Sequence, residues 1–173
     1  DLNNSAKATH LSPLYTSSYD NGYGFSASYG VSIISAYGFD KNKLIIGCAG
    51  YGKAYKVTSS GGAYPALGTS GTLTKISGYD GSFASGTVYG SVINQLINSG
   101  KYTLYTEKTK TGLVVGSYLY SSTDKIFITF DSKEAVMAKY EYAYENGLGM
   151  MCWAYTEDTS DTVINAIYEA KNK

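Results

Sequence analysis

Two short apolar runs, far apart in the sequence, constrain the fold of this 173-residue chain more than any other feature. Residues 44–49 and 149–154 are almost wholly apolar and too short for helices, which is typical of strands buried on both faces of a parallel sheet. Helical patterns alternate with these runs, so the order predicts βα units. Two strands cannot satisfy the backbone groups along their own edges. The sequence therefore predicts part of a larger α/β architecture.

Four segments carry apolar residues at helical spacing and are expected to form helices. Ser26 can cap the first, and Asp131 with Glu134 forms a cap pair for the third. Gly38 and Gly147 suit the ends of these two helices. The four expected helices cover residues 25–37, residues 88–99, residues 131–147 and the residues that follow Ser160.

The middle of the chain has a different character. The stretch from residue 54 to about 87 is rich in Gly, Ser and Thr and is not expected to hold long regular elements. Three strand candidates follow the second helix, at residues 102–107, 113–120 and 125–130, and the last of them is apolar on both faces. Together these segments predict a compact α+β lobe in which helix 88–99 packs on a small antiparallel sheet.

Composition excludes several classes of function. Fourteen lysines, with no arginine, balance fourteen acidic residues, so the charge pattern argues against a nucleic-acid partner. No run approaches the ~18 apolar residues that a membrane-spanning helix needs. Cys48 and Cys152 form no CxxC pair, and His10 is the only histidine, so no metal, cofactor or histidine-based mechanism is expected. We interpret His10 as a surface or packing residue.

Several motifs, taken in order, resemble the C-terminal part of a glycoside hydrolase family 18 chitinase. Asp1-Leu2-Asn3 resembles the end of the Met-x-Tyr-Asp motif of the sixth barrel strand, and Ser12-Pro13-Leu14-Tyr15 resembles the loop after it. The run from Lys43 through Tyr51-Gly52-Lys53 resembles the seventh strand. Phe130-Asp131-Ser132-Lys133-Glu134 and Cys152-Trp153-Ala154 resemble the seventh helix and the eighth strand.

The resemblance implies an α/β fold, the C-terminal part of a (β/α)8 TIM barrel with an inserted α+β domain. Residues 1–53 would supply the end of strand six, helix six and strand seven. Residues 54–126 would be the insertion domain. Residues 127–173 would supply helix seven, strand eight and helix eight. An N-terminal barrel fragment or chain is then the expected partner, and Asp1, with no leader before it, is interpreted as the start of a processed product or fragment.

The same resemblance implies hydrolysis of chitin or chito-oligosaccharides by a retaining, substrate-assisted mechanism, in a secreted protein. In that mechanism the N-acetyl group of the sugar attacks the anomeric carbon while a glutamate protonates the leaving oxygen. The family signature Asp-Gly-x-Asp-x-Asp-x-Glu does not occur in these 173 residues. No catalytic residue is therefore assigned in this chain, and the general acid is expected outside it.

Four residues are candidates for substrate binding by this resemblance. Asp1 would accept a hydrogen bond from the acetamido group, unless it is simply an exposed terminus. Tyr51 and Lys53 would lie at the mouth of the barrel, although Lys53 could equally be a solvated loop lysine. Trp153 would form the apolar floor under the reacting sugar, and its alternative is a packed core residue.

Other observations remain open at this point. The acidic cluster Glu157, Asp158 and Asp161 is best explained by complementation of the dipole of the last helix. Cys48 and Cys152 would lie on neighbouring strands and are interpreted as structural. Two alternative interpretations remain. The protein is a chitinase-like lectin that lacks the glutamate, or it is a self-standing α+β domain with a structural role.

Overall fold

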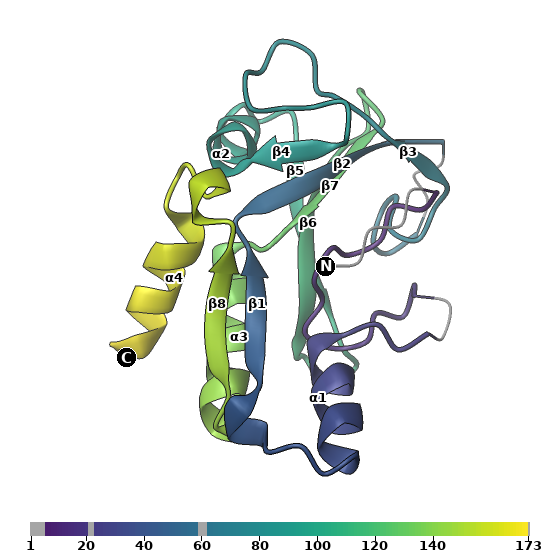
Figure 1. The fold of residues 1–173 in the computed structure, drawn as a ribbon. Coiled ribbons are helices and arrows are strands. Elements are labelled where there is room, and N and C mark those ends of the chain that lie inside the picture. Colours follow the sequence, from purple (N-terminus) through teal and green to yellow (C-terminus); the bar gives the residue numbers. More distant parts are fainter. Residues whose placement is uncertain (1–5, 21–22, 59–61, 173) are drawn as a thin grey trace.

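The computed structural model describes residues 6–20, 23–58 and 62–172, and Figure 1 shows their arrangement. Two parallel strands backed by two helices stand below a larger antiparallel sheet that carries a third helix. The elements are α1 (Ala27–Ala36), η1 (Lys41–Lys43), β1 (Ile45–Ala49), β2 (Tyr51–Val57), β3 (Gly71–Leu73), β4 (Thr87–Tyr89), α2 (Gly90–Asn98), β5 (Thr103–Lys108), β6 (Val114–Ser121), β7 (Ile126–Phe130), α3 (Lys133–Asn146), β8 (Gly149–Trp153), η2 (Tyr155–Glu157) and α4 (Thr162–Lys171).

β1 and β8 pair in parallel along their whole length, from Ile45 opposite Gly149 to Ala49 opposite Trp153, which confirms the predicted pairing. The prediction that both faces are buried is wrong. Cys48 on one face packs with residues of α3 and α4, whereas Ile45 on the other face is 62% exposed. Met151 and Trp153 lie on this second face as well and are 41% and 64% exposed, whereas Ala49 at its end is buried.

The antiparallel sheet has the strand order β3-β2-β7-β6-β5, with β4 also paired to β2. The strands β5, β6 and β7 were predicted from the sequence, and α2 lies where a helix was expected. β2 was missed beyond Lys53, because the Gly, Ser and Thr content after residue 54 suggested irregular structure. The resemblance placed the boundaries of the insertion domain at 53/54 and 126/127. In the structure, β2 and β7 run without a break across these two positions.

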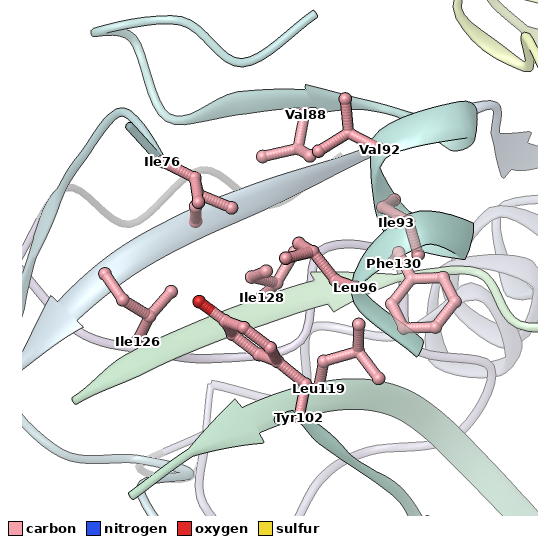
Figure 2. Packing of buried hydrophobic residues seen from close by; sticks show 11 residues of the cluster. Ile76, Val88, Val92, Ile93, Leu96, Tyr102, Leu119, Ile126, Ile128 and Phe130 are labelled. Atoms are coloured by element: carbon pink, nitrogen blue, oxygen red, sulfur yellow. The ribbon is translucent and has the colours of Figure 1, made fainter. Parts of the chain in front are cut away.

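The two faces of this sheet carry separate cores. Figure 2 shows α2 laid on one face, where Leu96 lies beside Ile128 of β7, and Val92 and Ile93 belong to the same cluster. The other face is covered by irregular chain, and Tyr55, Tyr118 and Phe127 of the sheet pack there with Ala8, Ala66 and Leu67. Each face therefore buries its apolar residues within the described chain, unlike the open face of β1 and β8.

The start of α3 differs from the prediction. Ser132, not Asp131, caps the helix by accepting a hydrogen bond from the amide of Ala135. Asp131 is instead buried and pairs with Lys139 of α3 at 2.7 Å. Its carboxylate also accepts the amide hydrogen of Ala49 at 2.7 Å, so it serves the end of β1 rather than its own helix.

This ion pair closes part of the free edge of β1. Leu44 and Gly50 hydrogen bond to β8, so the odd-numbered residues of β1 direct their backbone groups away from β8. Asp131 takes the amide of Ala49, and Lys139 donates to the carbonyl of Gly47 at 3.3 Å. Only the first part of this edge remains open for another strand.

The segment before α4 connects the two sheets. The carboxylate of Asp158 accepts the amide hydrogens of Thr162, Val163 and Ile164, which confirms the helix-dipole interpretation for this residue. Thr159 accepts the amide hydrogen of Ser91 and so satisfies the first turn of α2.

No helix in the described part of the chain is long and apolar enough to cross a membrane.

Candidate functional site

The carboxyl ends of β1 and β8 meet just where the chain passes into the antiparallel sheet (Figure 1). Gly50 permits this close approach, since a Cβ there would lie 2.6 Å from the carbonyl oxygen of Ala154. The Gly50 amide donates to the carbonyl of Trp153 at 2.9 Å, and the peptide bond between Trp153 and Ala154 is cis. The carboxyl edge of a parallel sheet is where such folds place binding groups.

Trp153 presents its indole at this edge. The side chain is 64% exposed and lies on the uncovered face of the two strands. The alternative that it is a packed core residue is wrong for this chain. Tyr155, two residues later, is also 62% exposed. An exposed flat indole offers an apolar plane on which a sugar ring can stack.

Tyr51 and Lys53 follow on β2. The Lys53 ammonium lies 5.6 Å from the centre of the Tyr51 ring and donates a hydrogen bond to Thr87 at 2.9 Å. Lys53 is therefore neither freely solvated nor paired to a carboxylate in the described contacts. The Thr87 contact could not have been predicted, because it comes from another strand of the antiparallel sheet.

Electrostatics at these residues follow from partial burial. Burial lowers the pKa of Lys53, and the negative charge of Glu157 opposes that shift. Burial raises the pKa of the Tyr51 phenol, and Glu157 and Asp131 raise it further. Tyr51 thus remains a neutral hydrogen-bonding group at neutral pH. Together with Trp153 they combine an apolar plane with polar groups, which suits a carbohydrate.

The remaining candidates have different outcomes. Asp1 lies outside the described residues. The carboxylate of Asp158 accepts hydrogen bonds from the first turn of α4. Asp161 directly precedes this helix, but its side chain makes no capping hydrogen bond. Within residues 6–20, 23–58 and 62–172, no group of three His, Cys, Asp or Glu side chains could hold a metal ion. Cys48 and Cys152 lie opposite each other as free thiols.

Comparison with known proteins gives the family. The model of the glycosyl hydrolases family 18 matches residues 1–158. The chain belongs to glycoside hydrolase family 18. The chain is 27% identical over 160 residues to a probable endochitinase of Orgyia pseudotsugata multicapsid polyhedrosis virus, and this match covers 90% of the chain but 26% of the relative. A chitinase of Autographa californica nuclear polyhedrosis virus is 26% identical over 164 residues, covering 92% of the chain and 28% of the relative.

Solved structures of the family have the same fold. The Group IV chitinase of Ostrinia furnacalis superposes with a TM-score of 0.75 at 22% identity, covering 98% of this chain and 47% of that one. A class V chitinase from Nicotiana tobaccum, solved as a mutant in complex with NAG4, gives a TM-score of 0.72 at 21% identity, covering 96% and 43%. This family 18 chain thus spans less than half of these structures.

Proposed function

We propose that this chain forms the C-terminal part of a (β/α)8 barrel with an inserted α+β lobe, and that the completed barrel hydrolyses chitin or chito-oligosaccharides. The observation that carries the proposal is the exposed indole of Trp153 at the carboxyl end of two parallel strands, next in space to the chain that bears Tyr51 and Lys53. Family membership and the NAG4 complex of a related chitinase support the substrate class.

The uncovered surfaces support completion by a second part. A groove of about 420 Å³ lies between α1 and β1, and its lining includes Phe25, Tyr29, Ile34 and Ile45. Each of these residues is more than 40% exposed, which leaves apolar surface on both sides of the groove. The first part of the β1 edge is open beside it. We infer that the remaining strands and helices of the barrel pack here, as an N-terminal part of the protein or a separate chain.

In the completed barrel, Trp153 would hold the face of the reacting sugar, and Tyr51 and Lys53 would bind its polar edge. Asp1 would accept a hydrogen bond from the acetamido group, whose carbonyl oxygen attacks the anomeric carbon with retention of configuration. The glutamate that protonates the leaving oxygen lies outside this chain in this proposal. The lobe of residues 54–126 would form one wall of the cleft, and an extracellular polymer as substrate implies a secreted protein.

A Trp153→Ala variant of the completed protein tests the site. We expect roughly tenfold to a hundredfold weaker binding of chito-oligosaccharides, in line with the ~1–3 kcal/mol of an aromatic stacking contact. kcat should also fall, because the floor supports the distorted sugar of the transition state. The melting temperature should change little, because in this proposal the indole faces the substrate cleft and not the core of the barrel. Calorimetric titration, product release and thermal unfolding measure these three quantities.

Tyr155→Ala is the matched control, because it removes a similarly exposed aromatic residue two positions after Trp153, at the start of η2. Unchanged affinity and kcat in Trp153→Ala, or the same losses in both variants, would contradict the assignment. A chitinase-like lectin is the alternative with the same platform. The lectin alternative predicts that Trp153→Ala weakens binding while the unaltered protein releases no product. A completed barrel that lacks the glutamate would establish this alternative.

A further inference from the structure

Glu107 is a buried carboxylate of the α+β lobe whose hydrogen-bond partners come from the N-terminal segment. It lies on the edge strand β5, beside the bulge at Lys108, and is 1% exposed. One oxygen lies 2.8 Å from Nε2 of His10 and accepts the hydroxyl hydrogen of Ser17 at 2.7 Å. The other oxygen accepts from the backbone amide and the hydroxyl of Ser18, at 3.1 and 2.8 Å. Four donors from one stretch therefore converge on this carboxylate.

His10 is fixed in the same cluster. It is 2% exposed, and its Nδ1 has no hydrogen-bond partner among the described residues. A Cβ on Gly116 would lie 2.7 Å from Nδ1, so the ring rests directly on the backbone of β6. Because Nε2 faces a carboxylate, the ring carries its proton there and donates to Glu107.

The contacts point to a fastening between two parts of the chain. The stretch that binds Glu107 lies on the face of the antiparallel sheet opposite α2. There the amide of Leu14 also donates to the carbonyl of Val115 in β6 at 2.8 Å. We propose that Glu107 and His10 form an acid-released latch that fastens residues 10–18 onto the α+β lobe. The latch is a property of this chain and does not depend on the proposed hydrolysis.

The groups around Glu107 determine the direction of the pH effect. Burial raises the pKa of Glu107, but the hydrogen bonds from His10, Ser17 and Ser18 and the attraction to His10 outweigh burial, so the pKa lies below its ordinary value of 4.5. Tyr118 of β6 also faces the carboxylate, and burial raises the pKa of that phenol. Lys108, the next residue, pairs instead with Glu134. A depressed carboxyl pKa means that the latch is closed above pH 4.5 and opens as the pH falls through the lowered pKa.

Hydrogen exchange of the whole chain, corrected for the intrinsic pH dependence of exchange, tests the latch. The reporters are the amides of Ser18 and Leu14, with Gly50 as a reporter outside the segment. In the unaltered chain we expect protection of Ser18 and Leu14 to hold at neutral pH and to fall below pH 4.5, before that of Gly50. In Glu107→Gln, protection should be roughly tenfold to a hundredfold lower already at neutral pH, because hydrogen bonds to a charged group are lost.

Two further variants make the result specific. Glu134→Gln removes a neighbouring carboxylate whose pKa is also lowered but which binds Lys108, and it should leave protection of Ser18 unchanged. Gly116→Ala keeps Glu107 and displaces the His10 ring, so it should lower protection as Glu107→Gln does. Neutral-pH protection in Glu107→Gln equal to that of the unaltered chain would overturn the proposal. So would a release midpoint above pH 4.5, or release that occurs only together with Gly50.

Discussion

Replacing Lys139 by methionine is expected to destabilise the fold strongly, because it breaks a buried ion pair. The Lys139 ammonium lies 2.7 and 2.8 Å from the two oxygens of Asp131 and 2.9 Å from the hydroxyl of Ser12. The two charged side chains are 1% and 3% exposed. Methionine keeps the unbranched apolar stem of lysine but lacks the ammonium group. The carboxylate is then buried without its cation, which costs about 3–5 kcal/mol of unfolding free energy.

Lys133→Met is the matched control on the same helix. Lys133 is also ion-paired, to Glu169 at 2.6 Å, but the two side chains are 56% and 48% exposed. An exposed pair contributes ~0–1 kcal/mol, so this variant should unfold almost like the unaltered chain. Urea unfolding of both variants, with the slope checked for equality, measures the difference. A second variant, Lys139→Met with Asp131→Asn, should recover part of the loss.

The reasoning would be refuted if the two single variants differed by less than about 1 kcal/mol, the upper value of an exposed pair. That result would mean that water or another cation reaches Asp131. It would also remove the argument that the pair stabilises the end of β1, where the carboxylate accepts the amide hydrogen of Ala49.

Two other outcomes follow from the structure. Asp158→Ala should lower stability by about 1–2 kcal/mol, because three amides of α4 lose their acceptor. Asp161→Asn should stay within about 0.5 kcal/mol, because asparagine tolerates the left-handed backbone of this position and no side-chain cap bond is lost. Equal melting temperatures of the two variants would contradict this. Burial raises the pKa of Cys48 to about 12 and that of Cys152 to about 11. At pH 8 the thiols of the native chain should therefore react with a thiol reagent at least roughly a hundredfold more slowly than those of the unfolded chain. A fast reaction phase in the native chain would contradict this prediction.

Local patterns in the sequence were enough to predict most of the regular elements. The helix that begins after Ser26, the antiparallel strands β5 to β7 and the left-handed end of α3 at Gly147 depend on neighbouring residues, and all are found where they were expected. The parallel pairing of β1 and β8 was also predicted, from their shared apolar pattern and from the order of elements in the family that the chain resembles. β2, β3 and β4 were missed, because their pairing in the antiparallel sheet overrides an unfavourable local composition.

For the candidate site, the sequence determined which residues lie at the strand ends, but the tertiary structure decided what surrounds them. Trp153 was predicted as a binding residue from the family resemblance and from its place near the end of an apolar run. Its exposure was decided by the packing of the folded chain, because Ala49, which pairs with it on the same face, is buried. The contacts of Lys53 with Thr87 and of His10 with Glu107 join residues 34 and 97 positions apart. No local pattern encodes such pairs, because burial and chain topology bring them together only after the sheet has formed.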